Sequence, residues 1–323
     1  PNVVAEKHLR LKLTDTGLAL KNKSTKRGAC VTPLVEDDVL DRMVRWRRAN
    51  IERLAKVLAA PIDELPRDAA LDLLERVNKV MEREAYRLTT RDGGPGGVLR
   101  LPGRPIPIFV GDLHACIDNL LVILTQSAFL ESLQDGSALL ILVGDAVHPD
   151  EPGQVDQMDL SMLLMDLIFR LKLKFPDRVF YLRGNHDSFA EDIAKGGVPQ
   201  GLVWEKALLD QRGVRYRDGM QRFYDLLPYI AVSPDYVCCH AGAPTMKVSR
   251  SDLINTGDQP KLRHQLTHVR LRKPNSPSGY GSGDIKRLRK QLGVESDTPF
   301  VVGHTPLSPD KTLWMNAGGI EHH

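Results

Sequence analysis

The sequence predicts an α/β fold with an N-terminal helical extension, and three observations support this prediction. Apolar residues with helical spacing dominate the part of the chain that precedes a glycine-rich stretch at 92–97. After that stretch, short apolar runs of β-prone residues recur along the chain. Further helical patterns separate several of these runs, which is typical of α/β proteins.

Two helices are expected before the glycine-rich stretch. Apolar side chains recur at intervals of three and four residues over 34–59, and the same spacing continues on one face over 66–88. We therefore predict an N-terminal helical extension and Gly-rich linker over residues 1–97, and a second domain over residues 98–323. The expected role of the extension is packing against that domain, and a regulatory or dimerising role is the alternative.

Five β-prone runs and three helical patterns are recognisable in the second domain. The helical patterns lie at Asn119 to Ser127, Met158 to Leu173 and Ile285 to Leu292. The β-prone runs are Ile106 to Val110, Leu139 to Val143, Val179 to Leu182, Tyr236 to Cys239 and Phe300 to Val302. This periodicity alone indicates an open α/β sheet with functional residues at the carboxyl ends of its strands.

The composition is that of a soluble globular protein. Hydrophobic residues make up 42% of the 323 residues, and no apolar run reaches the roughly 18 residues needed to cross a bilayer, so no membrane partner is expected. A net charge of +3 does not indicate a nucleic-acid partner, and the basic stretch 261–273 is interpreted as a solvated loop. The four cysteines lack the spacing of a metal site and no secretory segment is recognisable, so we expect reduced cysteines and a cytoplasmic protein.

Each β-prone run leads into a polar motif that is rich in metal-binding residue types. The motifs supply aspartates, an asparagine and histidines, a mixed donor set that favours Mn, Fe or Zn. In chain order they are Gly111-Asp112-Leu113-His114, Gly144-Asp145, Gly184-Asn185-His186-Asp187, His240-Ala241-Gly242 and Gly303-His304-Thr305.

The spacing of these motifs suits a pair of divalent ions that share a carboxylate. Asp112 and His114 can reach one ion from a single loop, and Asp145 on the next strand can bridge to a second ion. The second ion would be completed by Asn185, His240 and His304. Since two such ions lower the pKa of a shared water and clamp phosphoryl oxygens, the pattern predicts metal-dependent hydrolysis of phosphate esters.

His186 is the candidate general acid. It directly follows Asn185, which would place its imidazole beside the leaving oxygen, and a histidine near carboxylates can be protonated at neutral pH. Each of these residues alone also has an ordinary structural role, in a cap, a turn or the core. Five such motifs in order, all at predicted strand ends, favour the chemical interpretation.

From about Arg104 onward the sequence resembles the phosphoprotein phosphatase family, the serine/threonine phosphatases among the calcineurin-like metallophosphoesterases. The arginine before Gly184 favours this family over other branches of the superfamily. Besides the ligand motifs, the resemblance rests on Leu182-Arg183-Gly184-Asn185-His186, Phe223-Tyr224-Asp225-Leu226-Leu227-Pro228 and Cys238-Cys239-His240-Ala241-Gly242.

The resemblance implies a central β-sandwich flanked by helices, so residues 98–323 are expected to be a metallophosphoesterase catalytic domain. It also implies direct attack on phosphorus by a metal-bound hydroxide, without a phosphoenzyme. The first ion is expected on Asp112, His114 and Asp145, and the second on Asp145, Asn185, His240 and His304.

The chain departs from the family after the bridging aspartate. The family has a second Asp that orients the general-acid histidine and then an Arg that binds phosphate, whereas this chain has His148 and Pro149. His148 is expected to take over part of the orienting role, or Asp150 if the loop shifts.

A second phosphate-binding arginine is missing where this chain has Ser276-Pro277-Ser278. Arg183 and Arg272 are therefore the substrate-binding candidates, with Arg270 or Lys273 as alternatives. Ala115 and Ala241 also replace family glycines, and these small changes are compatible with metal binding.

The predicted function is that of a metal-dependent protein phosphatase acting on phosphoserine or phosphothreonine, with phosphotyrosine as a further substrate. One alternative is hydrolysis of small phosphate esters or dinucleoside polyphosphates with the same ions. Another is a phosphatase-like domain that binds phosphorylated partners with little turnover, against which the complete set of predicted ligands argues.

Overall fold

The computed structural model describes residues 9–14, 17–22, 37–126, 128–306 and 315–323. The chain divides into two compact units, Pro1–Ala49 and Asn50–His323. The first unit contains an antiparallel hairpin of β1 (Leu9–Thr14) and β2 (Gly17–Asn22), which the sequence did not predict. Helix α1 (Asp37–Leu58) begins in the first unit and ends in the second.

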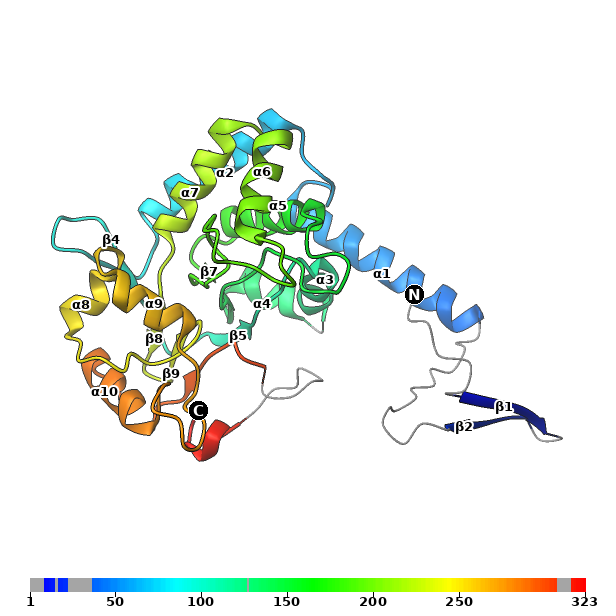
Figure 1. Ribbon diagram of the computed structural model, residues 1–323. Coiled ribbons are helices and arrows are strands. Elements are labelled where there is room, and N and C mark those ends of the chain that lie inside the picture. The colour runs from blue at the N-terminus through cyan, green and yellow to red at the C-terminus, as the bar shows by residue number, and fades with distance from the viewer. Residues whose placement is uncertain (1–8, 15–16, 23–36, 127, 307–314) are drawn as a thin grey trace. The chain divides into compact units, whose positions relative to one another are not determined.

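The second unit contains the remaining elements (Figure 1). Its helices are α2 (Arg67–Glu82), α3 (Ile117–Thr125), α4 (Phe129–Asp135), α5 (Asp159–Lys174), α6 (Gln200–Gln211), α7 (Val214–Leu226), α8 (Arg250–Ile254), α9 (Pro260–His268) and α10 (Ser282–Leu292), with short 3-10 turns at Thr256–Asp258 and Ala317–Gly319. Its strands are β3 (Arg87–Thr89), β4 (Pro95–Arg100), β5 (Ile106–Val110), β6 (Ala138–Leu142), β7 (Val179–Tyr181), β8 (Ile230–Ser233), β9 (Tyr236–Cys239) and β10 (Phe300–Val301).

These strands form a sandwich of two sheets, with the orders β10-β9-β8-β4-β3 and β5-β6-β7. Successive side chains of a strand point to opposite faces, so β6 places Leu139 and Ile141 against the other sheet and Leu140 and Leu142 against helices. The sandwich implied by the family resemblance is confirmed. The open sheet indicated by periodicity is wrong, because a strand buried on both faces has the same apolar pattern in either fold.

Helices cover both outer faces of the sandwich. Apolar residues of α2, α3, α4, α5, α6 and α7 pack on the three-stranded sheet, and those of α8, α9 and α10 pack on the five-stranded sheet. The basic stretch 261–273, expected to be a solvated loop, instead lies largely in α9, because Leu262 and Leu266 are buried against the five-stranded sheet. No helix within the described ranges is long and apolar enough to span a membrane.

The helices predicted at 34–59 and 66–88 correspond to α1 and α2. Helix α2 ends at Glu82, and the chain then enters β3, which pairs with β4. The glycine-rich stretch 92–97 forms the turn of this hairpin and the start of β4. A Cβ at Gly96 would lie 2.5 Å from the carbonyl oxygen of Leu88, so the close approach of the two strands requires glycine there. The predicted domain boundary between residues 97 and 98 stays a prediction, and it falls inside β4.

Candidate metal centre

Five loops that leave the carboxyl ends of strands are joined by hydrogen bonds. The backbone N–H of His304, after β10, donates to Oδ1 of Asp112, after β5, over 3.0 Å. The N–H of Gly303 donates to the carbonyl of His240, after β9, over 2.8 Å. The N–H of His186, after β7, donates to Oδ1 of Asp145, after β6, over 2.7 Å. The N–H of Leu113, also after β5, donates to the carbonyl of Asp145 over 3.1 Å, so all five predicted motifs meet at one end of the sandwich.

Asp145 lies at the centre of this assembly. It is 1% exposed, and it belongs to both groups of side chains whose potential ligand atoms lie within 4.8 Å of one another. Its φ of 53° is in the left-handed region, which is uncommon for a non-glycine residue and is typical of functional sites. A Cβ at Gly184 would lie 2.1 Å from Oδ1 of Asp145, so the loop after β7 can approach the carboxylate only with glycine there.

The group on one side of Asp145 contains His240 and His304, and Asn185 adjoins it. The Nδ1 atom of His240 donates to the carbonyl of Val143 over 2.7 Å, which leaves Nε2 facing the centre. This Nε2 lies 3.0 Å from Oδ1 of Asn185 and 3.2 Å from Oδ2 of Asp145. Three potential ligand atoms thus converge, from Asp145, Asn185 and His240.

The charges of this group perturb one another strongly. Burial alone would lower the pKa of His240, but the carboxylates of Asp145 and Asp112 raise it to about 9. Burial alone would raise the pKa of Asp145, but the positive charge of His240 and its hydrogen bond hold it below the ordinary range. The two side chains therefore form an ion pair in the metal-free protein.

The group on the other side of Asp145 contains His114 and His186. The Nδ1 atom of His114 donates to the carbonyl of His148 over 3.0 Å, so its Nε2 is also free for a ligand. Asp112, which was predicted to bind the first ion, lies at the edge of this group, with Oδ2 3.9 Å from Nε2 of His114. Burial raises the pKa of Asp112.

His186 contacts His148, the residue that stands where the family has its orienting aspartate. The two Nδ1 atoms lie 3.0 Å apart, so one donates and the other accepts. The Nε2 atom of His148 is buried and has no hydrogen-bond partner among the described residues. Because a buried bare acceptor costs less than a buried N–H without an acceptor, we assign the proton of His148 to Nδ1 and that of His186 to Nε2.

Both rings of this pair have low proton affinity. His148 is fully buried beside Trp204, and burial together with the charge of His186 lowers its pKa to about 3. Burial is also the main cause that lowers the pKa of His186 to about 4. In the metal-free protein both rings are therefore neutral at pH 7.

Asp187 is a buried residue that sequence reasoning assigned no role. Its Oδ1 accepts from the hydroxyl of Tyr181 over 2.6 Å, and its Oδ2 accepts from the N–H of Gly184 over 2.7 Å and of Asp145 over 3.3 Å. Burial and the nearby charge of Asp145 raise the pKa of Asp187 to about 6. It fixes the loop after β7 to the loop after β6, and its place at the end of the motif Gly184-Asn185-His186-Asp187 was the available signal.

The two predicted substrate-binding arginines make other contacts. Arg183 donates to the carbonyl of Tyr224 and lies 3.7 Å from Asp225, at the end of α7. Arg272 donates twice to the carbonyl of Gly279 and lies 3.7 Å from Asp284. In the described contacts neither guanidinium reaches the candidate ligands.

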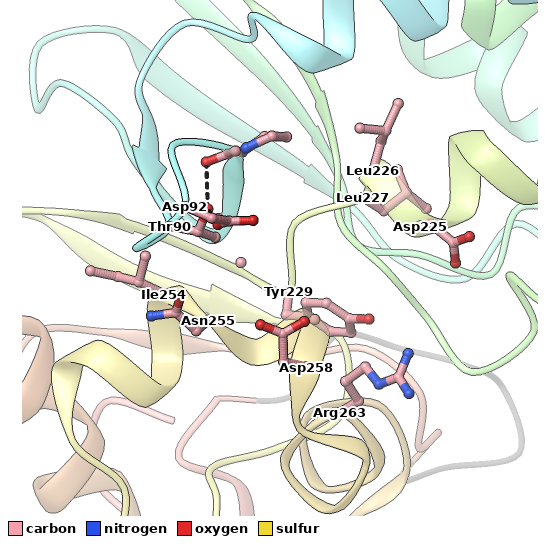
Figure 2. Close-up of a pocket in the computed structure, with 15 residues that line it drawn as sticks. Thr90, Asp92, Asp225, Leu226, Leu227, Tyr229, Ile254, Asn255, Asp258 and Arg263 are labelled. Carbon is pink, nitrogen blue, oxygen red and sulfur yellow. Dashed lines mark hydrogen bonds between the residues drawn. The ribbon is translucent and has the colours of Figure 1, made fainter.

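A pocket of about 400 Å³ lies near Arg183 but contains no candidate ligand. Figure 2 shows that the turn between β3 and β4, the end of α7 and the segment after α8 surround it, with the exposed Asp92, Asp225 and Asp258 on its rim. The candidate chemistry is therefore at the metal centre and not in this pocket.

The comparisons with known proteins agree with this geometry. The family model described as calcineurin-like phosphoesterase matches residues 108–321, which include all the predicted metal ligands. No curated protein matches the chain.

Among solved structures, a protein serine/threonine phosphatase from Saccharomyces cerevisiae, similar to human phosphatase PP5, is 15% identical with a TM-score of 0.54. That match covers 84% of this chain and 78% of the yeast chain, and it shows a shared fold. A cold-active protein-tyrosine phosphatase of a psychrophilic Shewanella species is 18% identical with a TM-score of 0.42, covering 65% of this chain and 67% of the other.

Proposed function

The chain belongs to the calcineurin-like phosphoesterase family, and from this premise we propose that it is a dimetal phosphatase that hydrolyses phosphate monoesters on proteins. The observation that carries the proposal is the position of the Asp145 carboxylate, which belongs to both groups of potential ligands. A carboxylate shared between two neighbouring ions is the arrangement that a dimetal phosphoesterase requires.

The donor atoms fit two ions of Mn, Fe or Zn. The Nδ1 atoms of His114 and His240 are held by backbone carbonyls, so both rings offer a lone pair on Nε2. We assign Asp112, His114 and Asp145 to the first ion and Asp145, Asn185, His240 and His304 to the second. When bound, two such ions lower the pKa of a water molecule and offset the charge of the phosphoryl group.

In this proposal, His186 donates a proton to the leaving oxygen of the substrate. Its ring lies in the group formed with His114 and Asp145, beside the proposed reaction centre. The low pKa of His186 makes it a strong acid once protonated, and the negative charge of a bound phosphate ester favours that protonated form. In that form Nδ1 of His186 also carries a proton, so the proton of His148 moves to Nε2 and Nδ1 of His148 accepts from His186.

His148 orients His186 in place of an aspartate. Its Nδ1 is within hydrogen-bonding distance of Nδ1 of His186, and its own backbone N–H donates to the hydroxyl of the buried Ser161 over 3.2 Å. The backbone of His148 is thereby held by Ser161 and its ring by Nδ1 of His186 and the edge-on contact with Trp204, which sets the direction of Nε2 of His186.

Phosphoserine and phosphothreonine in proteins are the proposed substrates, with phosphotyrosine as a further one. Support comes from the runs around Arg183 and Tyr224 that resemble the phosphoprotein phosphatases. The two runs contact each other, since Cζ of Arg183 lies 5.6 Å from the centroid of the Tyr224 ring.

The deciding experiment compares a panel of phosphopeptides with diadenosine tetraphosphate and mononucleotides at matched Mn concentrations. We expect the highest kcat/KM with phosphopeptides, and turnover of p-nitrophenyl phosphate that is abolished in Asp145→Asn. A preference for nucleotides would replace the protein substrate with a small phosphate ester. Absence of turnover with every ester, in protein that carries two ions, would leave a phosphate-binding domain instead of an enzyme.

A further inference from the structure

A short turn beyond the predicted motifs holds a lysine in a defined position. Lys195 and Val198 exchange two backbone hydrogen bonds of 3.0 Å around Gly196 and Gly197. Both glycines have positive φ, 58° and 81°, as a two-residue type I′ turn requires. The backbone of Lys195 is therefore part of a hydrogen-bonded turn, while its side chain is exposed.

This turn is attached to the loop that carries His148. The fully buried Gln200, which begins α6, donates from Nε2 to the carbonyls of Pro149 and Val155 over 2.7 and 2.8 Å. The Nζ atom of Lys195 lies 3.0 Å from Oδ2 of Asp150. Two separate connections thus bring the turn to the residues that follow His148.

The ion pair with Asp150 places the charge of Lys195 next to the loop that carries His148. Asp150 is two residues from His148, and His148 contacts the proposed general acid His186. The ammonium of Lys195 therefore lies beside the loop that holds His148 against His186.

The same region needs a cation that no other predicted residue supplies. A phosphate monoester is a dianion at neutral pH, and Pro149 carries no charge next to the orienting His148. An ammonium has three donors, and Asp150 can take one of them while the others remain for a ligand. With 43% of its side chain exposed, Lys195 is accessible to a substrate.

We propose that Lys195 is a substrate-binding residue that donates to a phosphoryl oxygen of the ester, and that Asp150 positions its ammonium. This inference rests on the proposed function, because it assigns the phosphate contact of the same site. It also accounts for Pro149, which stands where the family has a phosphate-binding Arg. In this chain the cation would come from Lys195 in the neighbouring turn instead of from the loop of Pro149.

The test measures binding of inorganic phosphate to the Mn-loaded protein by calorimetry. In Lys195→Met we expect the Kd for phosphate and the KM for p-nitrophenyl phosphate to rise about tenfold, with kcat changed less than threefold and metal content unchanged. Lys195→Arg keeps the charge and should stay within about threefold of wild type. In Asp150→Asn we expect an intermediate rise in both constants.

Lys206→Met is the matched control, because Lys206 is exposed and pairs with Asp210 along α6. It removes the same charge without touching the turn, so its phosphate affinity should equal that of wild type. Equal phosphate affinity in Lys195→Met and Lys206→Met would overturn the inference. Loss of affinity in Lys195→Met in a protein that hydrolyses no ester would refute the proposed enzyme but support the phosphate contact. A metal-loaded wild type that binds no phosphate would overturn both.

Discussion

The Nδ1 atoms of His148 and His186 lie 3.0 Å apart, in a part-buried contact between the loops that follow β6 and β7. Two histidine rings take the place of the aspartate–histidine pair that the family resemblance implies. An ionised aspartate can only accept a hydrogen bond from the histidine beside it. In the neutral pair seen here, His148 as assigned donates from Nδ1 to Nδ1 of His186. The pair therefore fixes the opposite tautomer of His186, with its proton on Nε2.

Replacement of His148 tests this orienting role. In His148→Ala we expect kcat to fall about 10- to 100-fold, because His186 loses the hydrogen bond that sets its ring. The amide of His148→Asn can still donate to Nδ1 of His186, so this variant should keep most of the activity. Steady-state kinetics with p-nitrophenyl phosphate give the answer, with KM and metal content expected to stay constant. Equal losses in the Ala and Asn variants would indicate a packing role instead of orientation.

The burial of His148 also predicts a pH dependence of stability in the metal-free protein. Its pKa is lowered from 6.5 to about 3 by folding. Below pH 6.5 the unfolded chain gains a proton that the folded protein does not take up, so the contribution of His148 is present above pH 6.5 and is lost as the pH falls towards 3. At pH 5 the loss from this group amounts to about 2 kcal/mol.

Urea unfolding in EDTA at pH 7.5 and pH 5 measures this effect. The free energy of unfolding should fall by about 2 kcal/mol less in His148→Gln than in wild type between these pH values. His240 contributes with the opposite sign, because its pKa is raised to about 9, but it is present in both proteins and cancels. The same fall in both proteins would show that His148 takes up protons freely when folded.

Asp145→Asn tests the shared carboxylate. An amide keeps the size of the side chain but removes the negative charge that two ions would share, so we expect less than two bound ions per chain and a loss of activity of about 10²-fold or more. Metal analysis after gel filtration and turnover of p-nitrophenyl phosphate measure the two effects. Gln154 is exposed and outside the centre, so Gln154→Ala serves as a control with unchanged metal content. Two retained ions in Asp145→Asn would contradict the bridging role.

The strands that lead into the site could be predicted because each is a short apolar run followed directly by a polar motif. Val110 and Leu142 are buried in the core, which requires apolar side chains there, and Asp112 and Asp145 follow them just beyond the strand ends. The apolar run therefore predicts the strand, and the polar motif after it predicts the site residues.

Other parts of the fold left no such signal. The hairpin of β3 and β4 was hidden because its glycines, among them Gly96, are required by close backbone contacts and look like a linker. Lys195 was not a candidate because only the fold brings its turn to Asp150, two residues after His148. The contacts of Arg183 and Arg272 depend on carbonyl groups, which the sequence does not display.

A buried charge cluster outside the site gives the last prediction. Glu84, after α2, accepts from Nζ of Lys172 over 2.6 Å and from two nitrogens of Arg87 over 2.8 and 3.0 Å. Burial lowers the pKa of both cations, which shows how costly their charges are without this carboxylate. In Glu84→Gln we expect a loss of about 3 to 5 kcal/mol in the free energy of unfolding, because two buried cations lose their counter-ion.

The control is Glu82→Gln, which removes an exposed pair with Arg222 and should cost less than about 1 kcal/mol. Urea unfolding at pH 7.5 compares the two, and similar losses would mean that the buried cluster is no stronger than a surface ion pair.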